Sequence, residues 1–282
     1  MSKINKIVVF ILSETRSGST WLSYVLGSHQ NAVHLGEYYR PFTRSGHVAC
    51  RLCEAKGKKK CKYLHGIENI SEEKAFDFAF ERFNKQYLID CSKQLTWLKK
   101  FVFSETFQVK IIHLMRDPRA WYASEKRRNN NLKIYDAMNR WIMTNTSIKN
   151  TIKELSLSHV TSFYDELCLH PDDYFSSDIS SFLEMPFESE ALEYWKKEHH
   201  GLGGNGAALN NLFNYPQRQV VTGDDEYYRK NLGRHFYDSR WLEQLSPDER
   251  KIIERMPSIN EYLNKHGKNF THFNDLLKET VG

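Results

Sequence analysis

Apolar runs and helix-spaced apolar positions alternate along the first 165 residues of the chain. Residues 6–12 (KIVVFIL) form a β-branched run without a polar break, which is typical of a strand covered on both faces. Similar runs occur at 87–90 and 109–115, and a further strand is expected near 159–164. A polar turn and a helix-spaced segment that stops at Gly27 follow the first run. This order predicts an α/β fold with a mostly parallel sheet and helices on both of its faces.

The remaining helices and the domain organisation follow from the same pattern. Helices are expected at 72–85, 95–104, 118 to about 128, about 135–155 and 246–265, the last broken at Pro257. Asp117 and Pro118 mark one helix start, because aspartate caps helices and proline suits the first helical position. Residues 199–206 form a glycine-rich loop. With no repeat or linker, the sequence predicts one domain over residues 1–282, with a Cys/Lys-rich insertion at about 43–70.

Composition adds a weak preference for anionic ligands. Forty Lys and Arg against 35 Asp and Glu leave a formal charge of +5, which is too small and scattered to indicate nucleic acid. The longest strongly apolar run, residues 7–12, is too short to span a bilayer and is interpreted as a core strand rather than a secretory segment. We therefore expect a cytoplasmic protein without a transmembrane segment or a nucleic-acid partner. The sequence does not indicate the oligomeric state.

The turn after the first strand, residues 15–21 (TRSGSTW), is the first candidate site. Gly18 lets the backbone approach a ligand, and the free N–H groups at the following helix start favour an anion. Arg16 adds a planar cation. Hydroxyl donors come from Ser17, Ser19 and Thr20. The alternative is a turn that only caps a helix, but an arginine directly after a buried strand favours a cradle for phosphate or sulfate.

This turn is not a Walker A loop. The first glycine and the lysine of that motif are absent, and no suitable Mg²⁺-binding aspartate follows an apolar strand. Asp90 is the nearest candidate and is followed by Cys-Ser-Lys. The turn is therefore expected to hold phosphate without an obvious metal, which argues against the main alternative, a Mg²⁺-dependent small-molecule or nucleoside kinase.

A second candidate phosphate site follows the strand at 109–115. Arg116 lies at the strand end, and Ser124 lies eight residues later in the predicted helix. A guanidinium and a hydroxyl in these positions are able to grip one phosphate from two sides. This spacing alone is a weak signal for a phosphate site, but it becomes more informative together with the first candidate site at residues 15–21.

The two signatures together resemble those of bacterial-type sulfotransferases that use 3′-phosphoadenosine 5′-phosphosulfate (PAPS). The matching patterns are a strand followed by T-x-R-S-G-S-T-W-L and a later strand followed by R-D-P-R-x₄-S. Weaker matches are Gly36-Glu37, DCSK at 90–93, FYDEL at 163–167 and HGLGGN at 200–205. The matches span about residues 6–241. Cys91 departs from the family's serine, and Asn205-Gly-Ala-Ala departs from its usual Asn-Pro-Met-Arg, which weakens assignment of nucleotide contacts in the late loop.

The resemblance implies a P-loop-like nucleotide-binding core that transfers a sulfuryl group from PAPS to an acceptor. By position, the 5′-phosphosulfate would be held by Arg16, Ser17, Gly18, Ser19 and Thr20, with Trp21 also counted among the cofactor-binding residues. Arg116 and Ser124 would hold the 3′-phosphate, and the late loop with residues 229–234 would close over the nucleotide. A catalytically inactive nucleotide-binding module is a further alternative.

Three side chains are the catalytic candidates: Glu37, Arg16 and Lys93. Glu37 is chosen as the base because it follows a short apolar segment, 32–35, expected beside the first strand, where partial burial would raise a carboxylate pKa. Arg16 and Lys93 are the cations for the charge that develops at the donor. His34 and His113 are rival bases, although His113 is expected to be a core histidine.

The cysteines and the acceptor leave open questions. Cys50, Cys53, Cys61 and His65 have spacings that a zinc ion is able to use, but free thiols or a redox-labile Cys50–Cys53 pair are favoured over structural zinc. Carbohydrate, lipid-linked, polyketide and phenolic acceptors all remain open, so the expected partner is a small-molecule or glycan acceptor. Tyr38, Tyr39 and Phe42 either line an acceptor pocket or pack in the core.

Overall fold

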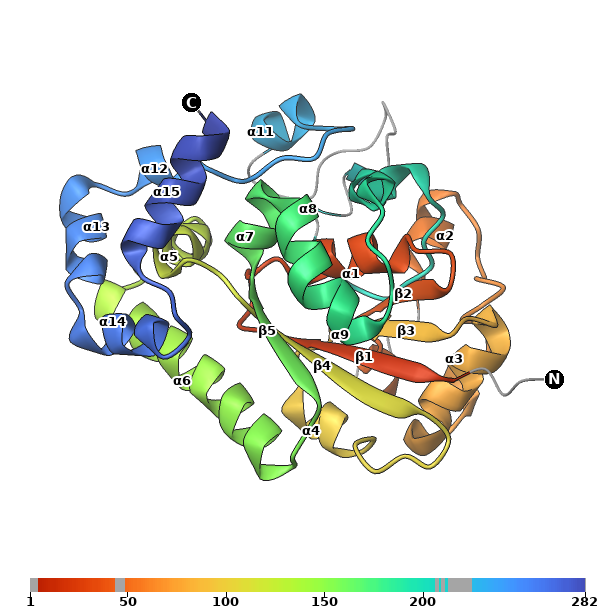
Figure 1. The fold of residues 1–282 in the computed structure, drawn as a ribbon. Coiled ribbons are helices and arrows are strands. Elements are labelled where there is room, and N and C mark those ends of the chain that lie inside the picture. The colour runs from red at the N-terminus through yellow and green to blue at the C-terminus, as the bar shows by residue number, and fades with distance from the viewer. Residues whose placement is uncertain (1–4, 44–48, 206–207, 209–210, 213–224, 282) are drawn as a thin grey trace.

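Five parallel strands form the centre of the computed structural model, which describes residues 5–43, 49–205, 208, 211–212 and 225–281 (Figure 1). The strands are β1 (Ile7–Leu12), β2 (Ala32–Gly36), β3 (Tyr87–Asp90), β4 (Gln108–Met115) and β5 (His159–Phe163). Their spatial order is β2-β3-β1-β4-β5, and all four pairings are parallel. Every residue of β1 is buried, which explains its unbroken apolar run. The predicted α/β fold is confirmed.

Helices connect the strands and cover the sheet. The first half contains α1 (Ser19–Gly27), η1 (Arg40–Phe42), α2 (Arg51–Ala55), η2 (Ile67–Asn69), η3 (Glu72–Lys74), α3 (Ala75–Phe83), α4 (Leu95–Lys99), α5 (Pro118–Lys126) and α6 (Ile134–Glu154). After β5 come α7 (Tyr164–Leu169), α8 (Pro171–Tyr174), η4 (Phe175–Ser180), α9 (Ser181–Leu183) and η5 (Ser189–Lys196). Helix α1 contacts β1, β2 and β3, whereas α6 contacts β4 from the opposite face (Figure 1).

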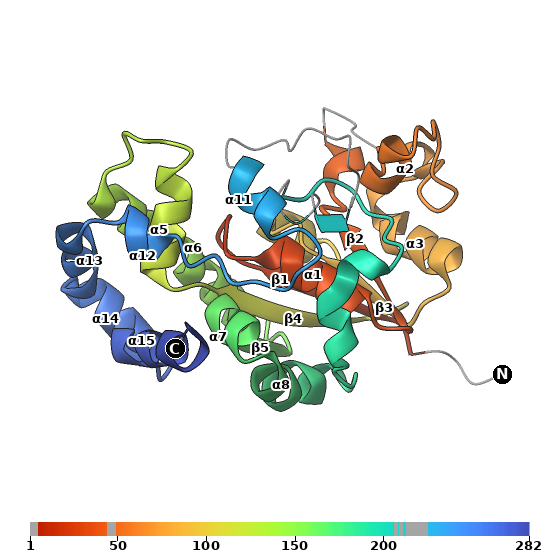
Figure 2. The same cartoon turned by 90° about the horizontal axis from the view of Figure 1, so that it is seen from above.

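The C-terminal helices build a second buried cluster beside the sheet. These helices are α11 (Asp225–Lys230), α12 (Trp241–Gln244), α13 (Pro247–Glu254), α14 (Pro257–Asn264) and α15 (Phe270–Val281). Figure 2 shows α12 to α15 gathered around α5 and α6 at one end of the molecule. Trp121, Trp141 and Trp241 are almost fully buried in this cluster, so the cluster fixes α5, the helix that follows β4, against the sheet.

Element boundaries agree closely with the expectations in the first 165 residues. The Asp117 side chain accepts a hydrogen bond from the Arg119 N–H as the predicted cap. The helix expected at 95–104 ends at Lys99, and the one expected at 72–85 begins as the short η3. The expected position of β2 beside β1 is wrong, because β3 lies between them. The β1–α1–β2 crossover passes over one strand position, which β3 then fills.

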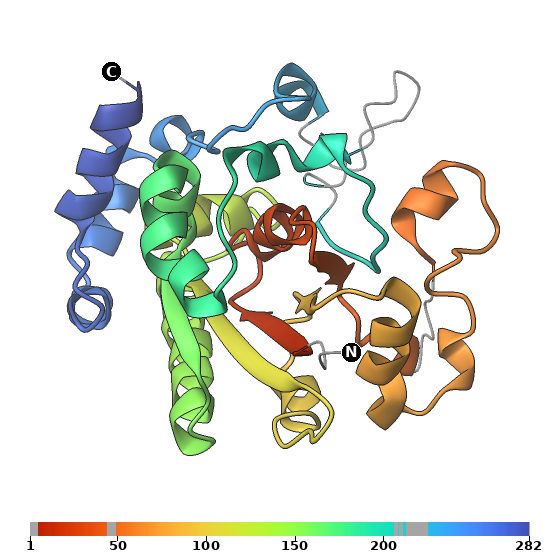
Figure 3. The ribbon, with the colours of Figure 1, turned by 45° about the vertical axis from the view of Figure 1, so that its right-hand side comes forward.

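The Cys/Lys-rich insertion contains α2 and three of the five cysteines. Helix α2 lies in the segment at the right-hand edge of the molecule in Figure 3, and residues 44–48 of the insertion lie outside the described residues. All five cysteines are described, buried and free of disulfides. Within the described ranges, no helix has the length and apolar character needed to cross a membrane.

Candidate functional site

The two predicted phosphate sites lie next to each other at the carboxyl ends of β1 and β4. These strands are neighbours in the sheet, so the residues that follow them meet at the same edge. The Arg116 Nη1 donates a hydrogen bond to the Arg16 carbonyl oxygen at 3.0 Å. The Arg16 Nε donates to the Ser124 Oγ at 2.9 Å. The structure therefore brings Arg16, Arg116 and Ser124 into one constellation.

Gly18 gives the first turn its shape. Its φ of +91° is in the left-handed region, and it precedes the first residue of α1. A Cβ at this position would lie 2.3 Å from Cδ2 of Tyr164. Both constraints exclude other residues here, so the backbone of the turn lies directly against the residue that begins α7.

We expect Gly18→Ala to destabilise the protein by about 1–3 kcal/mol, because the added methyl combines backbone strain with a clash. The measurement is chemical denaturation of the wild type and the variant. Gly267→Ala is the matched control, because Gly267 also has a positive φ (+66°) but no atom within 4 Å of an added Cβ. An equal loss in both variants would contradict the close packing of Gly18 on Tyr164.

Cations accumulate at this turn. Burial lowers the pKa of Arg16, and the charges of Arg127, Arg116 and Arg128 lower it further, although Tyr228 acts in the opposite direction. Arg16 also has a φ of +68°, a strained conformation for a residue with a side chain. Mutual repulsion among arginines costs free energy that a bound anion would offset.

Two buried polar atoms in the constellation have no hydrogen-bond partner among the described residues: the Ser17 Oγ and the Arg116 Nε. Buried polar groups without partners are uncommon and call for an explanation such as a ligand. An anion placed between these donors would satisfy both. Ser19 and Thr20 are buried at the start of α1, so the predicted phosphate-binding residues fit a multiply charged phosphate or sulfate ester.

Asp238 supplies the counter-charge behind this cluster. It accepts hydrogen bonds from Arg127 Nη2 at 2.9 Å and from Arg240 Nε at 2.7 Å. Burial raises the pKa of Asp238, but hydrogen bonds from Arg240 and the charges of Arg127 and Arg116 lower it to about 2. Asp165 also acts on Arg116, so two carboxylates face the guanidinium groups of four arginines, and the cluster stays positively charged. These arginines are Arg16, Arg116, Arg127 and Arg240.

The candidate base lies on the other side of β1, at the carboxyl ends of β2 and β3. The Glu37 Oε1 accepts a hydrogen bond from Lys93 Nζ at 3.1 Å, and its Oε2 accepts one from Arg40 Nε at 2.6 Å. Burial raises the pKa of Glu37, but Lys93 and Arg40 outweigh burial and the pKa is lowered. The expected raised pKa is therefore wrong, because the sequence did not reveal that Lys93 and Arg40 both pair with Glu37.

Lys93 is held in a single strained position. Its φ is +63°, and its Nζ also donates to the Cys91 carbonyl oxygen at 2.6 Å. Although burial acts to lower the Lys93 pKa, the net shift is upward because Cys91 and Glu37 stabilise the charged form. Lys93 therefore carries a fixed positive charge that faces Glu37.

The alternative bases His34 and His113 and the carboxylate of Asp90 are engaged in buried polar contacts. His34 is fully buried, its Nδ1 lies 2.6 Å from Ser23 Oγ, and burial lowers its pKa well below the ordinary value. His113 contacts Asn145 Oδ1 at 3.0 Å, and burial lowers its pKa to about 4. Both are core histidines. The Asp90 carboxylate accepts hydrogen bonds from Ser92 N and Trp97 Nε1, so both of its oxygens are already used within β3 and α4.

The late glycine-rich segment closes over the two strand ends. The Glu37 N–H donates to the Leu202 carbonyl oxygen at 2.7 Å, and the Asn205 N–H donates to Thr20 Oγ1 at 3.2 Å. A Cβ on Gly203 would lie 2.9 Å from Oε2 of Glu37. Of the Asn205-Gly-Ala-Ala departure, residues 206 and 207 lie outside the described residues.

Comparison with solved structures identifies the fold. The sulfotransferase domain from the curacin biosynthetic pathway superimposes with a TM-score of 0.53 at 18% identity, over 84% of this chain and 100% of that chain. This chain has the sulfotransferase fold. The sulfotransferase domain of the Synechococcus PCC 7002 olefin synthase matches at TM-score 0.45 and 19% identity, over 91% of this chain and 98% of that chain. Mouse sulfotransferase SULT7A1 complexed with PAP matches at TM-score 0.43 and 12% identity, over 99% of this chain and 89% of that chain.

No family model matches the sequence, and no curated protein matches it. The sulfotransferase fold is therefore established here by three-dimensional similarity. The family resemblance seen in the sequence agrees with this fold, because Arg16 and Arg116, which belong to the two signatures, follow adjacent strands.

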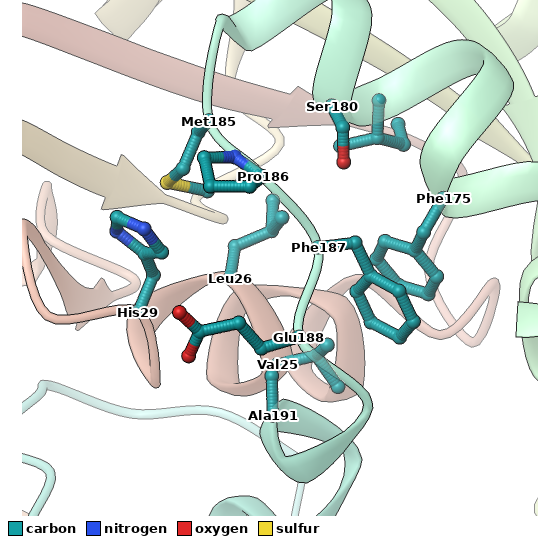
Figure 4. Close-up of a pocket in the computed structure, with 11 residues that line it drawn as sticks. Val25, Leu26, His29, Phe175, Ser180, Met185, Pro186, Phe187, Glu188 and Ala191 are labelled. Atoms are coloured by element: carbon teal, nitrogen blue, oxygen red, sulfur yellow. The ribbon is translucent and has the colours of Figure 1, made fainter. Parts of the chain in front are cut away.

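One apolar cavity lies away from this edge of the sulfotransferase fold. Figure 4 shows that Leu26, Met185, Phe187 and Phe175 surround it, with His29 and Glu188 at its side. Its volume of about 20 Å³ suits one or two water molecules rather than a substrate. Because it borders the carboxyl end of α1, it is separated from the turn at the amino end. Its small volume and its place at the other end of α1 argue against a role in binding a substrate.

The aromatic residues after Glu37 are mainly structural. Tyr38 is fully buried and its hydroxyl donates to the Ala75 carbonyl oxygen at 3.0 Å, so it does not line an acceptor pocket. Phe42 stacks on Trp97 with ring centroids 5.4 Å apart. Tyr39 is half-buried. After the turn that follows β1, Trp21 packs edge-on against Tyr164, with ring centroids 5.3 Å apart.

Sequence reasoning missed three parts of the sulfotransferase-fold site. Arg40 follows Glu37 by three residues, a spacing that predicts an ion pair only if the segment is known to turn. Arg127 lies three residues after Ser124. On a helix this spacing places both side chains on one face, so the sequence could have indicated Arg127 as a further cation. Asp238 lies 111 residues from Arg127, and no local pattern indicates that pair.

Proposed function

We propose that the chain is a PAPS-dependent sulfotransferase that transfers a sulfuryl group to a hydroxyl of a small-molecule or glycan acceptor. The observation that carries the proposal is the joint position of Arg16 and Arg116, linked by a hydrogen bond at adjacent strand ends. One adenosine carrying phosphate groups at both ends of its ribose would span them. The proposed enzyme is cytoplasmic and comprises one domain over residues 1–282, with the insertion at about 43–70.

The donor roles follow from the donors available. Arg16, Ser17, Gly18, Ser19 and Thr20 would hold the 5′-phosphosulfate, with Trp21 packed behind them. Arg116 and Ser124 would hold the 3′-phosphate. The buried Ser17 Oγ and Arg116 Nε, which have no partner among the described residues, are the donors that such a nucleotide would satisfy.

The reaction requires one bond to form and one to break. The acceptor oxygen bonds to sulfur while the bond between sulfur and the bridging oxygen breaks, and the electron pair leaves with adenosine 3′,5′-bisphosphate (PAP). Glu37 takes the acceptor proton. The transferred group bears one negative charge, so Arg16 and Lys93 are able to stabilise the loose transition state without a divalent metal ion.

The pH profile tests the role of Glu37. A carboxylate accepts a proton only when it is ionised, and the pKa of Glu37 is lowered from 4.5. We therefore expect kcat/KM to show no acid limb until the pH falls below 4.5. Arg40→Ala removes a cation that lowers this pKa, so its acid limb is expected at higher pH. If the acid limb of the wild-type profile lies at about pH 6.5, the ordinary pKa of histidine, the base would be a histidine instead.

The function itself is tested with purified protein, PAP and labelled PAPS. Calorimetry is expected to show one PAP bound per chain, and an acceptor screen is expected to show labelled-sulfate transfer that persists in EDTA. Turnover of ATP that requires Mg²⁺ would support the kinase alternative instead. PAP binding without transfer to any acceptor class would support an inactive module, and absence of PAP binding would overturn the proposal.

A further inference from the structure

Four metal-binding side chains converge where the insertion meets the glycine-rich segment. The Sγ atoms of Cys50, Cys53 and Cys61 and a ring nitrogen of His200 all lie within 4.8 Å of one another, and all four residues are buried. The His200 Nδ1 lies 3.6, 3.6 and 3.4 Å from the three sulfurs. One nitrogen thus faces three thiols at nearly equal distances.

Hydrogen bonding alone does not account for this geometry. The Nδ1 of an imidazole has either one proton or one lone pair, so it forms one good hydrogen bond and leaves two sulfurs without a partner on it. A tetrahedral zinc ion has Zn–S distances of about 2.3 Å and Zn–N distances of about 2.0–2.1 Å, which place ligand nitrogen and sulfur about 3.5–3.6 Å apart. The observed distances match the edges of such a tetrahedron.

The surroundings of the cluster also fit a metal site. The other ring nitrogen of His200, Nε2, lies 3.2 Å from Glu198 Oε1. A carboxylate on the free nitrogen fixes the tautomer and orientation of a metal-binding histidine.

We propose that Cys50, Cys53, Cys61 and His200 bind one structural Zn²⁺ ion. Three thiolates and one imidazole are a soft, four-coordinate donor set that favours zinc and leaves no open position for a substrate. His65, the fourth candidate ligand in the sequence, does not belong to the cluster. That side chain is exposed, and its Nε2 lies 3.5 Å from Lys60 Nζ, whereas His200 is contributed by a segment distant in sequence.

The zinc site would fasten the glycine-rich segment to the sheet. Leu202 forms β-bridges to both Gly36 and Cys50, and its carbonyl oxygen accepts the Glu37 N–H. Only Gly201 separates His200 from Leu202, so a metal bound to His200 would fix the backbone that holds Glu37. The metal site stands independently of the proposed sulfotransferase activity, because its ligands do not belong to the nucleotide-binding constellation.

Elemental analysis of the full chain, expressed with zinc and purified without chelator, tests the proposal. We expect about one zinc per chain, falling to a small fraction of that in Cys61→Ser and His200→Ala. Cys91→Ser is the matched control for a buried cysteine outside the cluster, and His65→Ala is the control for the rejected histidine. Both controls are expected to retain the wild-type zinc content.

A second measurement does not depend on variants that risk misfolding. Wild-type protein exchanged with Co²⁺ is expected to show intense thiolate-to-cobalt absorption and the visible bands of a tetrahedral ion. Chelation is expected to expose the three cluster thiols to a thiol reagent. Folded wild-type protein that contains no zinc and gives no cobalt spectrum would overturn the proposal. A Cys50–Cys53 disulfide detected by mass spectrometry of that protein would also overturn it. Zinc lost in His65→Ala but kept in His200→Ala would overturn the ligand set.

Discussion

Glu37→Gln is expected to lower kcat by about 10²–10⁴-fold, the contribution typical of a general base. Glutamine keeps the size of the side chain and is able to accept a hydrogen bond from Lys93 or Arg40, but it does not accept the acceptor proton. PAP affinity is expected to remain close to that of the wild type, because Glu37 lies at the β2 end of the edge and the phosphate-binding turn follows β1. Steady-state kinetics and calorimetry measure the two quantities separately.

The matched control is Glu261→Gln. Glu261 is also a carboxylate paired with a lysine, Lys265, but it lies on the surface of α14. We expect that variant to retain wild-type kcat and PAP affinity. An unchanged kcat in Glu37→Gln would assign proton removal to another group, and a parallel loss of PAP binding would mean that Glu37 supports the fold of the site rather than the chemistry.

Arg116→Ala is expected to weaken PAP binding by about 10–150-fold, which corresponds to the 1.5–3 kcal/mol of a hydrogen bond to a charged group. Arg116 is buried at the end of β4, its guanidinium lies 4.9 Å from the Tyr164 ring centroid, and its Nε has no partner among the described residues. A bound phosphate would take that position. Calorimetry with PAP measures the change, and the thermal midpoint shows whether the variant is folded.

Two further substitutions make this test specific. Arg116→Lys keeps the charge but removes the planar fork, so its PAP affinity is expected to lie between those of the wild type and Arg116→Ala. Arg82→Ala removes an exposed arginine from α3, which precedes the opposite end of β3, and is expected to leave binding unchanged. Wild-type affinity in a folded Arg116→Ala protein would remove this arginine from the nucleotide site.

Local patterns were sufficient for most of the sheet and for the first helices. The unbroken apolar run of β1 and the Asp117-Pro118 pair each specify structure through neighbouring residues, so the sequence predicted both. Strand order is different, because nothing within residues 32–36 records that β3 lies between β2 and β1. Helix α15 was also missed, although a local signal was present. Its apolar residues have helical spacing and pack against α7 and the C-terminal cluster, and the Asn269 side chain accepts a hydrogen bond from the His272 N–H at its start.

Some features of the site were likewise predictable from the sequence, and others depend on contacts between distant residues. Arg16 and Arg116 each follow a strand, so the topology of a parallel sheet brings them to one edge. The pKa of Glu37 depends instead on Lys93 and Arg40, and the direction of its shift is set by distances of 3.1 and 2.6 Å that only the folded chain provides. His200 replaces His65 at the cysteine cluster for a related reason, since the glycine-rich segment returns to β2 from far along the chain.

The strand order also gives the proposed donor a direction. In spatial order, the carboxyl ends of the five strands lead to Glu37, Lys93, Arg16, Arg116 and Tyr164, at about 4.8 Å per strand. A nucleotide with its 3′-phosphate at Arg116 would point its reactive end toward β2, where the cysteine-bearing segment begins. If the donor binds in this direction, we expect acceptor preference to be separable from donor affinity. Chimeras that exchange residues 49–70 but keep Cys50, Cys53 and Cys61 would test this without loss of the proposed zinc ligands.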